Sequence, residues 1–360
     1  MNIILIGQMI AVFAFFMGVL SLAGLLTWVE RKQSAVMQDR IGANRAEIFG
    51  FKAFGLFHII ADAIKMLTKE NFIPKNADRL LYQLAPIVSV FFAFITFAAI
   101  PFGDTLVLGE YEIPLRGIDL NVGLLYIFAM LSLAVYGVIL GGFASQTNYS
   151  FLGGIRASSQ LLAYEITIGV SIIGLIMCFE SLNLNQIVLA QGEYYWGWLP
   201  RWGVIVQPIG FIIFFTAAIA ETKRVPFDLP EAESEIVGYF VEYSGMRFGM
   251  FFLTDFLETV LIACLTATLF FGGWQVPGLF ADGFHFPWGV WNLSPLVITL
   301  FQVVGFAFKV LFFCWLLMTI RWTLPRFRYD QLMHLGWKIL FPLSIINILA
   351  TGFILLLVGN

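Results

Sequence analysis

The stretch IILIGQMIAVFAFFMGVLSLAGLLTW, residues 3–28, carries no charged side chain. A helix of about 20 apolar residues crosses the hydrocarbon core of a bilayer, which is about 30 Å thick. Glu30, Arg31 and Lys32 follow and end the apolar stretch. No basic residue precedes it and no small-residue cleavage site follows it, which argues against a removable signal peptide. Residues 3–28 therefore predict a transmembrane helix, and its excess length predicts a tilt.

The rest of the chain repeats this pattern. Of 360 residues, 60% are hydrophobic and only 12% are charged, and the mean hydropathy is +0.88, whereas about 25% of the residues in a soluble domain are charged. A soluble enzyme is excluded, and a net charge of −3 without a basic run excludes a nucleic-acid-binding protein. The sequence predicts one all-α integral membrane domain over residues 1–360. Eight transmembrane helices are expected at 3–28, 81–101, 121–143, 159–179, 204–220, 247–271, 296–320 and 338–358.

The basic residues predict the orientation of these helices. Seventeen of the 20 Lys and Arg residues fall in the odd-numbered loops and two in the even-numbered loops, while Lys309 lies inside the seventh span. Because positively charged loops stay on the cytoplasmic side, the odd loops are expected inside. Both termini are then expected on the outer (periplasmic) side, as an even number of spans requires.

Residues 48–69 are too charged to span a membrane and too apolar for a solvated loop. On a helical wheel, His58, Asp62, Lys65 and Lys69 share a narrow sector, and the remaining surface is mostly apolar. This pattern predicts an amphipathic helix at the membrane surface. Two roles are open for such a helix. It could anchor the chain at the membrane surface, with Asp62 and Lys65 paired, or it could form one wall of a cavity that opens from the lipid.

The loop over residues 221–246 is the most informative segment of the chain. Between Glu221 and Arg247 it holds six acidic residues against three basic ones. The dipole of a helix that begins after Asp228 accounts for Glu231 and Glu233, but not for the whole set. Clustered carboxylates near a low-dielectric region have raised, mutually dependent pKa values. We expect this acidic loop to serve proton transfer or a charge-triggered conformational change.

Charged residues inside membrane spans are costly and mark functional sites by default. Glu165 lies in the fourth expected span, and Asp255 and Glu258 lie one turn apart in the sixth. Structural pairing or snorkelling is the alternative for these side chains. A series of carboxylates at membrane depth is what a proton path requires.

Arg321, Arg326 and Arg328 are spaced by aromatic residues in the loop before the last span. They suit contact with anionic lipid headgroups, contact with the acidic loop, or simple retention of the loop on the inner side.

No cofactor site is visible in the sequence. It contains neither a GxGxxG nor a GxxxxGK[ST] motif. The three cysteines are far apart and form no CxxC pair, and His58, His285 and His334 are scattered. We therefore expect no NAD, flavin, haem, iron–sulfur cluster or metal to be held by this chain, and no complete redox site in it.

Five segments resemble the quinone-site membrane subunit of respiratory complex I, known as the H subunit in the bacterial NADH:quinone oxidoreductase and as subunit 1 in the mitochondrial enzyme. They are Glu30-Arg31-Lys32 with Met37-Gln-x-Arg40-x-Gly42-x-Asn44, Ala61-Asp62-Ala63-x-Lys65, Arg156-x-x-x-Gln160-x-x-x-Tyr164-Glu165, the run from Glu221 through Pro226-Phe-Asp-Leu-Pro-Glu-Ala-Glu-Ser-Glu235 to Glu242-Tyr-Ser244, and Arg321-x-x-x-Pro325-Arg326-x-Arg328-x-Asp330. The resemblance covers essentially the whole chain in order.

The resemblance implies a fold, a function and roles for particular residues. It implies an eight-span bundle that encloses a quinone tunnel together with soluble subunits, with the quinone tail passing between the first span, the surface helix and the sixth span. Residues expected to line the tunnel are Glu30, Arg31, Arg40, Asp62, Arg224 and Asp228. Residues expected to relay protons toward the pumping arm are Glu165, Glu221, Glu231, Glu233, Glu235 and Asp255, with Glu258 added from its place beside Asp255.

Several positions depart from the family pattern. Ala43 stands where the family has Pro, His58 where it usually has Gln, and Asp255-Phe256 where it has Glu-Tyr, while Glu258 replaces a neutral residue. The relay around Asp255 and Glu258 is therefore the part of the resemblance that transfers least directly.

The expected function is that of a membrane subunit of a proton-pumping NADH:quinone oxidoreductase, with ubiquinone or menaquinone as the substrate. Expected partners are soluble iron–sulfur and quinone-site subunits on the cytoplasmic side, the membrane subunits of the pumping arm, and lipids, but no nucleic acid. The expected location is the bacterial cytoplasmic (inner) membrane, or the mitochondrial inner membrane for an organellar protein. The alternatives are an anchor subunit of a membrane-bound hydrogenase-type complex and a stand-alone secondary transporter, although the transporter should show an inverted repeat.

Overall fold

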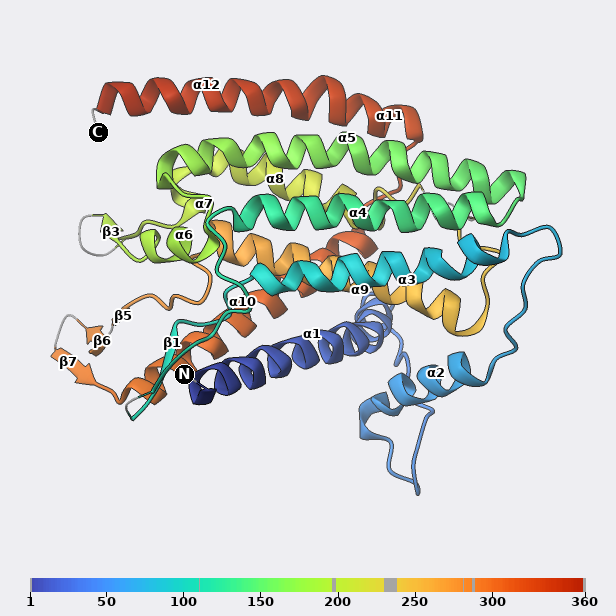
Figure 1. The fold of residues 1–360 in the computed structure, drawn as a ribbon, viewed down its shortest axis with the longest axis horizontal. Coiled ribbons are helices and arrows are strands. Elements are labelled where there is room, and N and C mark those ends of the chain that lie inside the picture. The colour runs from blue at the N-terminus through green and yellow to red at the C-terminus, as the bar shows by residue number, and fades with distance from the viewer. Residues whose placement is uncertain are drawn as a thin grey trace.

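Long apolar helices form most of the computed structural model, which describes residues 2–109, 111–195, 199–229, 238–280, 282–286 and 289–358 (Figure 1). Seven helices of this described part are long and apolar enough to cross a membrane. This confirms a mostly helical membrane protein. The main helices are α1 (Asn2–Met37), α3 (Arg79–Ile95), α4 (Gly123–Ala144), α5 (Asn148–Phe179), α9 (Gly245–Phe270), α10 (Pro295–Thr323) and α12 (Phe341–Val358).

The fifth expected span, residues 204–220, is interrupted. It consists of α7 (Gly203–Val206) and α8 (Pro208–Glu221), separated by Gln207, whose φ of −134° and ψ of 64° are not helical. Pro208 lacks a backbone N–H and so favours the start of a new helix at this point. The 14 residues of α8 rise roughly 21 Å, less than the thickness of a bilayer core, so α8 is not among the seven long helices.

Other predicted boundaries also change. Helix α5 begins eleven residues before the expected 159, and η3 (Leu335–Leu340), a π-helical turn, joins α11 (Tyr329–His334) to α12 in one long helical segment. The predicted surface helix at 48–69 is shorter, since α2 spans Phe57–Thr68. Residues Phe49, Ala53 and Phe54 have positive φ angles, and this left-handed backbone is incompatible with an earlier helix start.

Helix α9 is the core of the bundle. Every residue from Thr254 to Phe270 is buried, because α1, α3 and α10 pack around it. Helix α1, by contrast, exposes an apolar face that includes Met9 and Phe13, which are 63% and 68% exposed. An apolar belt of this kind is unfavourable in water and matches lipid. Close helix contacts use small residues, since a Cβ on Gly137 of α4 would lie 2.7 Å from the backbone of Ser89 on α3.

The two ends of the bundle differ in structure. Figure 1 shows both chain termini at the same end as several short strands, while α2 lies at the opposite end. The strands form small antiparallel pairings that the all-α expectation did not include. They are β1 (Thr105–Leu108) with β2 (Tyr111–Pro114), β3 (Tyr194–Tyr195) with β4 (Leu199–Pro200), and a sheet of β5 (Leu279–Phe280), β6 (Gly283–Phe286) and β7 (Gly289–Asn292). The α2 end carries the predicted site residues Arg31 and Asp62, which meet where α1 and α2 come together.

Candidate functional site

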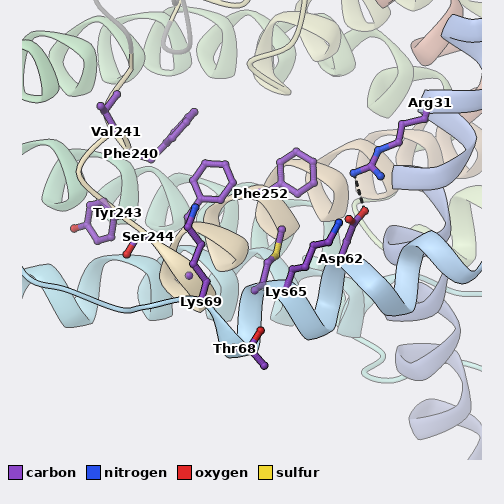
Figure 2. Close-up of a pocket in the computed structure, with 13 residues that line it drawn as sticks. Arg31, Asp62, Lys65, Thr68, Lys69, Phe240, Val241, Tyr243, Ser244 and Phe252 are labelled. Carbon is purple, nitrogen blue, oxygen red and sulfur yellow. Dashed lines mark ion pairs between the residues drawn. The ribbon is translucent and has the colours of Figure 1, made fainter. Parts of the chain in front are cut away.

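A pocket of about 770 Å³ opens where α1, α2 and α9 meet. We call it the mouth pocket. Its lining comes from α1, from α2 with the residue after it, from the segment before α9, and from α9; the lining residues are Arg31, Asp62, Lys65, Met66, Thr68, Lys69, Phe240, Val241, Tyr243, Ser244, Gly245, Phe248 and Phe252. Figure 2 shows Lys65 and Lys69 extending from α2 toward the aromatic side chains on the facing side. One wall therefore carries positive charge and the other is apolar, which suits an amphipathic guest.

Helix α2 forms the charged wall because it is amphipathic. Its apolar residues Ile60, Ile64 and Leu67 are 52%, 54% and 68% exposed, as expected for a helix that lies on lipid. Asp62 does not pair with Lys65, which was one interpretation of the sequence. It binds Arg31 on α1 at 2.7 Å (Figure 2), and this pair ties α2 to the bundle at one edge of the mouth pocket.

Glu30 lies at the centre of a second ionic network, one residue before Arg31. Its carboxylate binds Arg224 at 3.0 Å and Arg321 at 2.5 Å. The guanidinium of Arg224 also lies over the ring of Phe256, 3.9 Å from its centroid, and the Phe256 ring contacts Phe252 in the mouth pocket edge-to-face at 5.0 Å. An aromatic contact thus connects the mouth pocket to this network.

Asp228 makes one of the contacts that the sequence left open for the arginine-rich loop, the contact with the acidic loop. Its carboxylate accepts a hydrogen bond from Arg326 at 2.8 Å, and the side chain is buried. Burial raises the pKa of Asp228 to about 6, against the attraction of Arg326 and Arg321, and nearby Asp255 raises it further. Asp228 therefore changes its charge near physiological pH.

A third network lies deeper, around Lys223. The Lys223 ammonium binds Glu258 at 3.1 Å and Asp255 at 3.4 Å, and all three side chains are at most 6% exposed. The prediction that Asp255 and Glu258 share a face is confirmed. The sequence analysis did not identify Lys223 as their common partner. A lysine among acidic residues, in a chain with so few charges, could have indicated it.

Glu221 and Glu165 continue the series of carboxylates away from Lys223. Glu221 ends α8 and is 3% exposed, and its Oε2 has no hydrogen-bond partner among the described residues. Glu165 on α5 accepts a hydrogen bond from Ser132 of α4. The two carboxylates are close enough to repel each other electrostatically.

Gln160 is a second residue to which the sequence assigned no role. Its buried amide Nε2 donates to the carbonyl of Ala220 at 2.9 Å and to that of Phe227 at 2.8 Å. The chain between these two anchors carries Glu221, Lys223 and Arg224. At its far end, Phe327 N–H donates to the carbonyl of Pro226 at 3.1 Å. The polar loop is thus held at both ends by neutral hydrogen bonds.

Some predicted site residues do not join these networks. Arg40 follows α1, is exposed, and donates through Nε to Gln38 at 2.8 Å. Glu231, Glu233 and Glu235, together with the predicted helix start there, lie outside the described residues. Lys309, the basic residue inside an expected span, binds the backbone carbonyls of Phe271, Gly273 and Gln275 just after α9 at 2.6–2.9 Å, which is a structural role.

A metal or redox cofactor would need its own ligand set. Within the described ranges, no group of three or more His, Cys, Asp or Glu side chains is arranged to hold a metal ion. Cys264 and Cys314 are buried and form no disulfide. The geometry supplies a pocket for an amphipathic molecule and three adjoining ionic networks, whose chemistry is charge compensation and proton exchange.

Comparison with known proteins gives one consistent family. The family model described as NADH dehydrogenase matches residues 9–352. The chain is 47% identical over 343 residues to an H subunit of the NADH-quinone oxidoreductase of Geobacter metallireducens, covering 95% of this chain and 94% of that protein. It is 46% identical to the H subunit of the Thermomicrobium roseum enzyme, covering 93% and 92%, and 42% identical to an H subunit of the Cytophaga hutchinsonii enzyme, covering 98% of each. The chain therefore belongs to the NADH dehydrogenase family of membrane proteins that includes the H subunits of NADH-quinone oxidoreductase.

Proposed function

We propose that this chain is the quinone-site membrane subunit of a proton-translocating NADH:quinone oxidoreductase. In this proposal a quinone passes from the lipid through the mouth pocket, and the buried carboxylates behind it relay its change of redox state to the pumping arm. The observation that carries the proposal is the mouth pocket itself, with an apolar wall, a basic wall and a direct aromatic contact to the Glu30 network.

The chemistry of a quinone fits this arrangement. Its isoprenoid tail loses little free energy in moving from lipid to an apolar wall such as Phe248 and Phe252. Its headgroup accepts two electrons and two protons. Negative charge on a reduced headgroup near Glu30, Asp228 and Asp255 is unfavourable at low dielectric, so reduction favours proton uptake by these carboxylates. The electron donor and the protein groups that protonate the headgroup belong to neighbouring soluble subunits.

The proposal includes a topology. The seven long helices, together with the interrupted segment α7–α8, make eight crossings, with both termini on the periplasmic side of the cytoplasmic membrane. The excess of Lys and Arg in the odd-numbered loops supports this orientation. Soluble iron–sulfur and quinone-site subunits then cover the α2 end, and other membrane subunits contact the lipid-facing helices. Names shared by the relatives favour this assembly over a hydrogenase-type anchor or a stand-alone transporter.

Photoaffinity labelling tests the tunnel. The assembled enzyme in native membranes is illuminated with a quinone that carries a photoreactive group on its tail, and the labelled peptides are mapped. We expect labelling of residues 240–252 and of α2, reduced by an excess of unlabelled long-tail quinone. Competed labelling confined to the apolar groove between α1 and α10, around Phe15, Val303 and Phe306, would place the guest elsewhere and overturn the proposal.

Substitution of Glu165 tests the relay. Glu165→Gln keeps the side-chain size and a partner for Ser132 but cannot carry a proton in the same way. We expect quinone reduction to continue with fewer protons translocated per electron pair. Glu180→Gln, at the end of α5 remote from the acidic loop, is the matched control. Normal reduction together with normal translocation in Glu165→Gln would remove the relay from the proposal.

A further inference from the structure

Lys223 occupies an unusual position for a lysine. Its side chain is 2% exposed, although lysine is almost never fully buried unless it is paired. Its backbone has φ of +55°, in the left-handed region that a non-glycine residue adopts only when its surroundings hold it there. Both features require compensation, and the contacts to Asp255 and Glu258 provide it.

Arg224, the next residue, is directed to a different network. It binds Glu30 at 3.0 Å and lies over Phe256, whereas Lys223 binds the deeper carboxylates. Two consecutive residues therefore connect the network beside the mouth pocket to the buried carboxylates. The left-handed backbone at Lys223 directs the two side chains to these different partners.

Neutral contacts hold the chain on both sides of this dipeptide. Gln160 binds the carbonyls of Ala220 and Phe227, so the segment between them is fixed at its ends. A displacement of Lys223 then acts first on this short segment, which contains Arg224. Coupling of this kind needs an element that both sites bias, and the Lys223–Arg224 segment meets that requirement.

We propose that Lys223 is a positioning residue that couples the Glu30–Arg224 network to the buried carboxylates by sharing its ammonium between Asp255 and Glu258. When one of these carboxylates gains a proton, the ammonium moves toward the other, and the shift is transmitted through the backbone to Arg224. The charged groups that face Lys223 are Asp255 and Glu258 from α9, Glu221 from the end of α8 with Glu165 beyond it, and Arg224 beside it. This inference rests on the proposed function, since it concerns the relay of the same site.

The test uses the assembled enzyme reconstituted in vesicles, with quinone reduction and proton translocation measured together over a range of pH. Lys223→Met removes the ammonium and keeps the stem. Lys223→Arg keeps the charge. The double variant Lys223→Met with Glu258→Leu removes the ammonium and one carboxylate, so that the buried cluster keeps its net charge. Lys75→Met, at an exposed lysine outside the site, is the control.

We expect Lys223→Met to lose part of the proton translocation per electron pair while quinone reduction continues. It should also shift the pH profile of translocation, whereas Lys223→Arg recovers part of the ratio. The double variant should assemble like the control and remain uncoupled. If the single Lys223→Met variant fails to assemble, the double variant and Lys223→Arg carry the test.

Full recovery of translocation in the double variant would overturn the inference, because it would show that Lys223 only neutralises Glu258. A normal ratio in Lys223→Met would overturn it as well. Glu165→Gln, measured in parallel, separates this result from failure of the proposed function. Normal translocation in Glu165→Gln removes the relay itself, while a defect in Glu165→Gln combined with a normal Lys223→Met removes only the role of Lys223.

Discussion

The Arg31–Asp62 pair and the Lys223–Asp255–Glu258 cluster contain the same kinds of charged groups in different surroundings. At the mouth pocket, Arg31 and Asp62 are 45% and 24% exposed and 2.7 Å apart. In the interior, the three side chains are at most 6% exposed, with longer contacts of 3.1 and 3.4 Å. The shorter contact does not have the larger Coulomb attraction, because water screens the first pair and is largely excluded from the second.

This difference separates two tasks. An exposed ion pair can open and close at little cost, as a pocket that admits a guest from lipid requires. A buried cluster that loses one member leaves an unpaired charge at low dielectric, which is destabilising by about 3–5 kcal/mol. Charge changes in the interior must therefore be compensated by proton transfer or by movement. The Glu30 network, whose exposure is intermediate, lies between the two regions.

The largest effect is expected at Glu30, which binds two arginines. Glu30→Gln leaves Arg224 and Arg321 facing each other without their shared carboxylate, and we expect a loss of about 3 kcal/mol in stability. Thermal inactivation and the yield of assembled enzyme measure this loss. The double variant Glu30→Gln with Arg321→Gln removes one of the facing cations and should recover part of it. If thermal inactivation of the single variant is unchanged, the Glu30 carboxylate does not stabilise the two arginines as described.

Asp228 should show the next largest effect, as a dependence on pH. Because its pKa is raised to about 6, protonation stabilises the fold below the ordinary carboxyl pKa, and this contribution is lost as pH rises through about 6. Quinone reductase activity should change with pH in the opposite direction to stability. It should fall as pH drops through about 6, since the neutral carboxyl no longer binds Arg326 as an ion pair.

Asp228→Asn separates the effect of Asp228 on stability from its effect on activity. Near neutral pH the variant should be at least as stable as the wild type, because a buried ionised group is removed and Arg326 is 36% exposed and can be solvated. Its quinone reductase activity should be low and should lack the acidic limb near pH 6. The pH profile of activity and the thermal inactivation midpoint check both statements, and retention of the limb would assign the titration to another group.

A smaller effect is expected from narrowing the mouth pocket. Val241 lines the pocket and is 44% exposed, so Val241→Trp fills space without removing an ion pair. We expect a few-fold higher KM for long-tail quinones, a much smaller change for short-tail analogues, and an unchanged kcat. Val36→Trp, at a residue 77% exposed outside the pocket lining, is the control. An equal rise in KM for both quinone classes would argue against tail passage there.

The smallest effect is expected at the exposed pair itself. Asp62→Asn removes the partner of a half-exposed Arg31, and surface pairs contribute about 0–1 kcal/mol. Thermal inactivation should therefore change far less than in Glu30→Gln, and less still at high salt. A loss comparable to that of Glu30→Gln would erase the distinction between the mouth pocket and the networks behind it.

Periodicity and charge predicted the helices well because their signals are local. Residues 3–28 and the aliphatic run of α9 carry the needed information in their own composition. The break at Gln207 was not predicted. The stretch 204–220 is mostly apolar, and Pro208 near its start fits the first turn of one continuous helix as well as the start of a second helix. The later start of α2, at Phe57 instead of residue 48, was missed. Phe49 and Phe54 have a left-handed backbone, and phenylalanine rarely adopts this conformation.

Site residues were predictable as a set but not as pairs. Acidic residues in a charge-poor chain are conspicuous, so Glu30, Asp62, Asp228 and Asp255 could be selected. Their partners depend on how distant helices pack. Arg224 and Arg321, which share Glu30, are about a hundred residues apart in sequence, and Gln160 reaches the loop at Phe227 from α5. Lys223 was overlooked because its backbone conformation and burial follow from this packing.

Glu221→Gln offers the most direct test of the link between the mouth pocket and the interior. The side chain is buried, retains its size in the variant, and is close enough to both Lys223 and Glu165 to interact with them electrostatically. Proton translocation and quinone reduction are measured simultaneously in reconstituted enzyme, with the exposed Glu70→Gln as the control. The account predicts that quinone is still reduced while translocation per electron pair falls sharply. Equal ratios in Glu221→Gln, Glu70→Gln and the wild type would contradict it.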